Sequence, residues 1–119
     1  DKREYDNSIQ DYNKAIEYLK DFSTNAKQVQ AVAYGSIGDA YSELKKNDEA
    51  IEYYKKAGTH FPEDEAISSE YLFRAASFLE SNGKNDAALE IYKQIKQNYP
   101  KSEKGFSIDK YISRLQVQP

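Results

Sequence analysis

Few side chains in this sequence have the types and spacing that chemistry requires. His60 is the sole histidine and cysteine is absent, so neither a second imidazole nor a thiol can join it in a metal site or a nucleophilic site. His60 stands just before Phe61 and Pro62 at the end of a predicted helix, where a cation is favoured. We expect a structural or solvent-exposed role for it, and no catalytic residue.

Carboxylates gather at Glu63, Asp64 and Glu65, directly after Pro62. Acidic side chains at the start of a helix favour its positive end, and no EF-hand spacing surrounds these three. The glycines do not form a phosphate-binding loop. The sequence therefore predicts no metal site, no cofactor and no enzymatic activity.

Composition excludes further classes of function. The 119 residues suffice for one domain with its own core. The 20 acidic and 17 basic side chains give a net charge of -3, which is unsuited to nucleic acid. The longest apolar stretch, residues 31–34, is too short to cross a membrane, and the first residues do not resemble a secretory leader. Because position 1 is not Met, we expect a mature product or a piece of a longer protein.

The elements that would position any binding residue come from an internal repeat. The segment from Lys46 to Lys55 reappears as Lys84 to Lys93, and at the same offset Phe61-Pro62 corresponds to Tyr99-Pro100. A repeat of this length is typical of stacked supersecondary units.

Each unit is predicted to be two helices joined by a turn, because apolar residues recur at steps of three and four on both sides of a breaker. In the first unit, the row of the first helix is Val29, Ala33, Ile37, Ala40, Tyr41 and Leu44. Asn47 and Asn85 are expected to cap the second helices, and Pro62 and Pro100 to end them.

Each end of the chain adds a helix. Residues 4 to about 23 carry one apolar row, composed of Tyr5, Ile9, Tyr12, Ile16 and Leu19. Residues 103 to about 116 carry a narrower row opposite a charged face, as a helix that closes a stack requires. The sequence predicts an all-α fold with about six helices and no strand.

The first unit resembles the tetratricopeptide repeat, because Tyr34-x2-Ile37-Gly38-x2-Tyr41 is followed by Ala50-x3-Tyr54, Ala57 and Pro62. The second copy resembles it more loosely. The resemblance implies an α-solenoid of antiparallel helix pairs in a single domain, 1–119. We expect a partial repeat at 4–23, repeats at 31–64 and 65–102, and a capping helix at 103–116. Gly38 and Ala50 are small where the helices of the first pair would cross closely.

The N-terminal helix resembles a second helix whose partner is missing. The segment from Ala15 to Lys20 echoes Ala50 to Lys55, but Tyr5 to Ile9 could equally open such a helix, so two registers stay open. Repeats ending in Phe61-Pro62 or Tyr99-Pro100 also resemble those of bacterial envelope proteins of a Bacteroidetes type. This resemblance implies a periplasmic or envelope location through a missing N-terminal anchor; the alternative is cytoplasmic.

In this family the first helix of each pair lines a concave groove. The groove positions, with the adjacent Glu43, correspond to Val32, Gly35, Asp39, Ser42, Glu43, Glu70, Phe73, Ser77 and Glu80. The resemblance implies a small acidic face with one aromatic anchor, Phe73. The family's clamp for acidic chaperone tails needs Lys and Asn where Gly35 and Asp39 stand, so we expect a basic or neutral protein or peptide partner.

The 11 tyrosines could instead form a binding surface. Five fall at repeat-core spacing and are expected to pack: Tyr34, Tyr41, Tyr54, Tyr71 and Tyr92. Tyr18 and Tyr53 lie off the main rows and are candidates for contact with a missing neighbour.

The leading hypothesis is a non-enzymatic scaffold for protein–protein interaction that binds a peptide or partner helix. The alternative is a structural segment that extends or caps a longer solenoid, or that forms a homo-oligomer through its N-terminal helix. An enzyme is the third hypothesis, and the sequence offers no catalytic residues for it.

Overall fold

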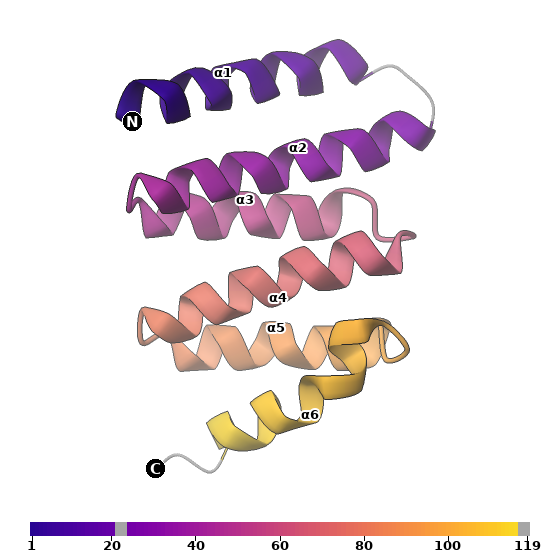
Figure 1. The fold of residues 1–119 in the computed structure, drawn as a ribbon. Coiled ribbons are helices and arrows are strands. Elements are labelled where there is room, and N and C mark those ends of the chain that lie inside the picture. The colour runs from indigo at the N-terminus through magenta and orange to yellow at the C-terminus, as the bar shows by residue number, and fades with distance from the viewer. Residues whose placement is uncertain (21–23, 117–119) are drawn as a thin grey trace.

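The described residues of the chain fold into six helices stacked one after another (Figure 1). The computed structural model describes residues 1–20 and 24–116. In chain order the helices are α1 (Lys2–Leu19), α2 (Thr24–Glu43), α3 (Asn47–His60), α4 (Glu65–Ser81), α5 (Asn85–Asn98) and α6 (Glu103–Gln116). No strand occurs among the described residues, so the prediction of an all-α fold is confirmed. The helix expected to reach about residue 23 ends at Leu19, and residues 21–23 lie outside the described part.

The helices form two layers. α2 contacts α4 and α4 contacts α6, so these three form an inner layer. α1, α3 and α5 form an outer layer, and in the described chain no two of them contact each other (Figure 1). A stack whose helices touch on one side and separate on the other curves toward the touching side. The inner layer therefore lines the concave side of the solenoid, which we call the inner face.

Large and small side chains interlock in the core. Tyr54 and Tyr92 are 2% and 0% exposed and pack among the alanines and branched residues of α3, α4, α5 and α6. A Cβ atom added at Gly38 would lie 2.8 Å from the ring of Tyr54 and 3.3 Å from the carbonyl oxygen of Ala50. The predicted close crossing at Gly38 and Ala50 is confirmed, and it leaves room for the tyrosine ring only because no side chain is present.

The predicted caps at Asn47 and Asn85 are wrong. Lys46 and Lys84 are the N-cap residues, and neither makes a side-chain capping bond. The reason is the tight turn: the Lys46 amide donates to the carbonyl of Tyr41 in the helix before, while its own carbonyl already accepts from Ala50 in the helix after. The asparagines thus stand one residue too late to cap.

The carboxylates after Pro62 lie where the sequence places them, at the start of a helix. Asp64 is the N-cap of α4, and its Oδ1 accepts the amide of Ile67 at 2.9 Å. Its other carboxylate oxygen accepts from the side chain of Gln28 at 2.8 Å, which ties α4 to α2. These bonds give the acidic side chain a structural role at the positive end of α4.

α1 can be compared with α3 by aligning the two helices at their ends. Four residues lie between α1 and α2, and four lie between α3 and α4. When α1 and α3 are aligned at their last residues, Ile9 corresponds to Ala50 and Ile16 corresponds to Ala57. Ile9 is the one buried residue of α1, and it packs against Ile37 and Ala40 of α2. In this alignment the buried Ile9 corresponds to the buried Ala50, although α1 itself begins at Lys2, before either segment.

A polar chain joins α1, α2 and α3. The Gln30 side chain donates to the carbonyl of Ile16 at 2.8 Å, and its Oε1 lies 2.9 Å from Nε2 of His60. The His60 ring also makes an edge contact with Tyr34 at 5.3 Å. Burial, with Lys27 nearby, lowers the pKa of His60, so the expected helix-end cation is disfavoured. The structural role expected for His60 is observed, because its ring is hydrogen-bonded to Gln30 and packs against Tyr34.

Candidate protein-binding face

The predicted groove positions all lie on α2 and α4, the first two helices of the inner layer. The half on α2 comprises Val32, Gly35, Asp39, Ser42 and Glu43, and the half on α4 comprises Glu70, Phe73, Ser77 and Glu80. α2 and α4 contact each other, so the two sets lie on neighbouring helices. Their surroundings differ, however, and decide which of them can meet a partner.

On α2, three of the predicted residues reach the surface. Val32 is 43% exposed, Glu43 is exposed and Ser42 is half-buried. Gly35 is buried, and a Cβ there would fall within the ring of Tyr71, so the surface at this position is presented by Tyr71 of α4. The absence of a side chain at Gly35 is what allows α4 to approach α2.

Asp39 belongs to a network between α2, α3 and α4. The Tyr54 hydroxyl donates to its Oδ1 at 2.6 Å, and Arg74 lies 3.2 Å from the same oxygen. Arg74 also pairs with Glu70 at 3.2 Å and lies 5.0 Å from the ring of Tyr71. Burial, together with Asp39, raises the pKa of Tyr54, so its hydroxyl stays a donor. Asp39 is therefore compensated within the protein.

On α4, the predicted residues are engaged by α5 and α6. Phe73 is half-buried, with Tyr111 at 4.9 Å, Tyr92 at 5.7 Å and the Lys104 ammonium 4.4 Å from its ring centroid. Lys104 also lies 3.8 Å from Glu70. The predicted aromatic anchor of the groove is thus an anchor for the capping helix α6.

Glu80 forms the strongest polar link on this half. Its carboxylate accepts from Arg114 of α6 at 2.6 and 2.7 Å and from the Tyr92 hydroxyl at 3.0 Å. The Ser77 hydroxyl lies 3.5 Å from that of Tyr92. Three carboxylates of the expected acidic face, Asp39, Glu70 and Glu80, are therefore paired with cations on α4 and α6. Glu43 is the remaining carboxylate of this set, and the structure shows no cation beside it.

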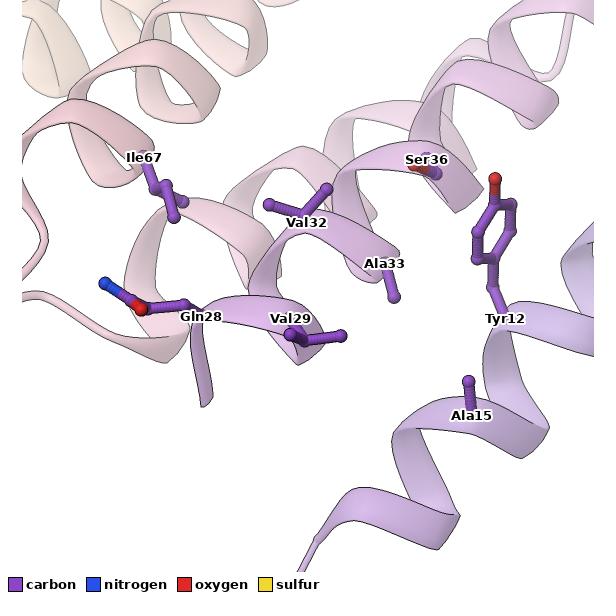
Figure 2. A pocket seen from close by; sticks show the side chains of 8 residues that line it. All are labelled: Tyr12, Ala15, Gln28, Val29, Val32, Ala33, Ser36 and Ile67. Atoms are coloured by element: carbon purple, nitrogen blue, oxygen red, sulfur yellow. The ribbon is translucent and has the colours of Figure 1, made fainter. Parts of the chain in front are cut away.

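One hollow of the described structure is not predicted by the sequence. It is a cleft of about 610 Å³ between α1 and α2 that reaches α4. Its lining is composed of Tyr12, Ala15, Gln28, Val29, Val32, Ala33, Ser36 and Ile67 (Figure 2). Among the described residues no charged side chain lines it, and Val32 also belongs to the predicted groove.

The apolar rows of their helices predict that Val29 and Tyr12 are buried, but the two side chains are 54% and 38% exposed. The rows do face the contact between α1 and α2, but α1 covers only part of α2. The signal that could have revealed the cleft is the combination of Val29 with Val32 on one helix and an N-terminal helix without its partner.

The tyrosine assignments are mostly confirmed. Tyr54 and Tyr92 are buried, and the other three core tyrosines are half-buried. The assignment of Tyr53 to a missing neighbour is wrong, because its ring lies 6.2 Å from Tyr34 and 5.5 Å from Tyr41 within the same repeat. Tyr18 is 75% exposed.

In the described part of the chain, no three histidine or carboxylate side chains come together in a way that could hold a metal ion. No described helix combines the length and apolar character needed to span a bilayer.

Comparison with known protein families agrees with the arrangement of the helices. Residues 31–63 match a family model described as tetratricopeptide repeat, and residues 70–102 match a second model of the same description. The two matches together cover more than half of the 119 residues. No curated protein matches the chain. The geometry of α2 to α5 and these two matches together show that the chain belongs to the tetratricopeptide repeat family.

Proposed function

We propose that this protein is a non-enzymatic scaffold that binds a peptide or helix of a partner protein through the α2 side of its inner face. Tetratricopeptide repeats generally mediate protein–protein interaction. The observation that carries the proposal is the contrast between the two halves of the inner face. Apolar Val32 and acidic Glu43 are exposed on α2, whereas the α4 positions already contact α5 and α6.

The charge expected of the partner follows from Glu43. Since Asp39, Glu70 and Glu80 are paired within the protein, a basic partner gains chiefly from the one carboxylate without a cation. An exposed pair of this kind contributes at most about 1 kcal/mol and mainly affects association rate and discrimination. Apolar contact at Val32 must therefore supply most of the affinity.

Site-specific photocrosslinking tests this function. A photoreactive amino acid is placed at Val32 or at Ser42 on the inner face, or at the exposed Lys93 of α5 in the outer layer as the matched control. In extracts of the source cells we expect one protein adduct of defined mass from the two inner positions and none from Lys93. The adduct should weaken when Glu43→Lys is added. Equal adducts from all three positions, or none from any, would exclude binding at this face.

Self-association through the N-terminal helix is a second candidate function, favoured by the apolar cleft beside α1. Sedimentation at increasing protein concentration tests it. A concentration-dependent rise in mass that Tyr12→Asp removes would support it, and a strict monomer would exclude it.

A role in a bacterial envelope assembly is the narrower form of the proposed function. It rests on the resemblance of the repeat ends Phe61-Pro62 and Tyr99-Pro100 to envelope proteins. Fractionation of source cells with an antibody to this domain tests it, since recovery in the cytoplasmic fraction alone would exclude it.

A further inference from the structure

The turn between α4 and α5 contains the one Asn-Gly pair of the sequence, Asn82-Gly83. Asparagine is among the chemically labile residues of proteins. Its side-chain amide can be attacked by the main-chain nitrogen of the residue that follows, and a following glycine hinders this attack least because it has no Cβ atom. The surroundings of Asn82 therefore decide whether this turn is a site of spontaneous modification.

The Asn82-Gly83 pair is open to solvent. Asn82 is the C-cap residue of α4, and both residues are exposed, as is Lys84 after them. The Asn82 side chain has no hydrogen-bond partner among the described residues. A Cβ atom added at Gly83 would meet no other atom within 4 Å. Side-chain packing therefore does not restrain the carboxamide of Asn82 or the backbone beside it.

Main-chain hydrogen bonds hold the turn in a conformation that prevents the reaction. The Gly83 amide donates to the carbonyl of Glu80 at 3.0 Å, and the Lys84 amide donates to that of Leu79 at 2.8 Å. Ring closure requires the Gly83 nitrogen and the Cβ atom of Asn82 to eclipse each other about the Cα–C bond. The ψ of Asn82 is 10°, which places that nitrogen beside the backbone nitrogen of Asn82 instead. The turn must therefore open before Asn82 can react.

Opening this turn does not require the helices to unfold. The segment that must move, residues 82–84, is exposed. Leu79 and Ala88 on either side are 4% and 0% exposed and belong to the core of α3 to α6. Exposed segments of this kind open with free energies far below that of global unfolding. Gly83 makes the movement easier, because a glycine adopts backbone angles on either side of φ zero.

The first repeat shows that the fold does not need an Asn-Gly pair in this turn. At the offset of the internal repeat, Leu44 and Lys45 correspond to Asn82 and Gly83. The Lys45 amide donates to the carbonyl three residues earlier at 2.9 Å, as the Gly83 amide does at 3.0 Å. The φ angles of Lys45 and Gly83 are 60° and 79°. The two turns thus have closely similar conformations, but only the second combines an asparagine with a following glycine.

We propose that Asn82 is a site of spontaneous, non-enzymatic modification in the folded protein, through local opening of the α4–α5 turn. The Gly83 nitrogen loses its proton to hydroxide and attacks Cγ of Asn82. The new Cγ–N bond forms as the Cγ–Nδ2 bond breaks, which releases ammonia and leaves a five-membered succinimide ring. Water then opens the ring at either carbonyl and gives aspartate or isoaspartate at position 82. The sum of the steps is the uptake of one water and the release of one ammonia.

The two products change the turn differently. Both place a negative charge at the C-terminal end of α4, where the helix dipole disfavours it. Isoaspartate also adds one methylene to the main chain between α4 and α5. The hydrogen bonds of Gly83 and Lys84 to the last turn of α4 cannot all be kept when the main chain lengthens. Isoaspartate therefore loosens the turn, whereas aspartate preserves its main-chain path.

Peptide mapping by mass spectrometry tests the inference on the intact protein after incubation for weeks at pH 8 and 37 °C. Asn98 is the internal control, because it is exposed at the end of α5 but is followed by Tyr99. We expect conversion at Asn82 to be about tenfold faster than at Asn98, because glycine leaves the attacking nitrogen unhindered. The variant Asn82→Gln needs a six-membered ring and should not convert over the same time. Conversion at Asn82 no faster than at Asn98, or only when the chain is unfolded in urea, would overturn the inference.

Low concentrations of urea distinguish local opening from global unfolding. Local opening exposes little surface, so the rate at Asn82 should barely change below the unfolding transition. A rate that rises steeply with urea would overturn the inference, because the reaction would then proceed from the unfolded chain.

The stability of the products tests the effect on the turn. The isoaspartate fraction, separated by chromatography and identified by enzymatic methylation, should unfold at a lower urea midpoint than Asn82→Asp. This variant carries the same charge without the extra methylene, so it is the matched control. Equal midpoints would overturn the loosening of the turn by isoaspartate.

Discussion

The hydroxyl of Tyr92 makes the stability of the C-terminal half depend on alkaline pH. Tyr92 is fully buried, and its hydroxyl donates to Glu80, which also accepts from Arg114 of α6. Burial, together with the acceptor Glu80, raises the pKa of Tyr92 to about 12, against about 10 in an unfolded chain. The folded state thus favours the protonated hydroxyl.

The sign and size of the effect follow from linkage. Because the pKa is higher in the folded state, the stabilisation is complete below pH 10 and is lost as the pH rises toward 12. Tyr92 alone should remove about 1.4 kcal/mol at pH 11 and about 2.3 kcal/mol at pH 12. Tyr54 and Tyr71 act in the same direction, since burial raises the pKa of each.

The variant Tyr92→Phe separates these effects. At pH 7 it loses a hydrogen bond to a charged acceptor, but Glu80 keeps its pair with Arg114, so we expect a loss of about 1–2 kcal/mol. Because Phe has no hydroxyl, the variant does not lose stability through deprotonation at position 92 when the pH rises. The difference from the unaltered protein should therefore shrink by pH 11 and vanish or reverse near pH 12.

Urea denaturation followed by circular dichroism at pH 7, 9, 10, 11 and 12 measures the difference. Tyr12→Phe, on the partly exposed ring of α1, is the matched control and should follow the unaltered protein at every pH. A constant offset between Tyr92→Phe and the unaltered protein from pH 7 to pH 12 would refute the reasoning, because Tyr92 would then not be the group that titrates.

Three further substitutions test the packing. Lys45 (φ 60°) occupies the left-handed turn position held by Gly83 (φ 79°) in the second repeat, so Lys45→Gly should raise stability by about 0.5–1 kcal/mol in urea denaturation. Gly58→Ala should destabilise by up to about 2 kcal/mol, because its Cβ would lie 3.0 Å from the Leu72 amide nitrogen and the overpacking exceeds the gain in helix preference. Phe73→Ala should lower stability by about 2–3 kcal/mol, and hydrogen exchange should show α6 loosened first.

The repeat architecture could be predicted because it depends on residues close in sequence. Gly38 of α2 and Ala50 of α3 lie on either side of the short turn that joins these helices. Because both residues are small, they determine where the two helices of the repeat cross. The same periodicity, copied in the second unit, left few alternatives for the fold. The caps were missed because the tight turn moved the helix start by one residue, to Lys46 and Lys84.

Which side chains of the predicted binding face already have partners within the protein could not be predicted in the same way. Whether Glu80 is free depends on Arg114, which lies on another helix and reaches it only because of how α6 is rotated against α4. Periodicity predicts that α6 has an apolar row but does not fix which charged side chains flank α4. The same holds for Phe73, whose position in the repeat is shared by groove residues of the family but whose ring is covered by Tyr111.

The two ends of the inner layer differ in what the described residues place beside them. At the C-terminal end, α6 occupies the place of a further inner helix and supplies Tyr111, Lys104 and Arg114 to the positions on α4. At the N-terminal end, α1 packs on α2, and the cleft between them is lined mainly by apolar side chains of the described residues.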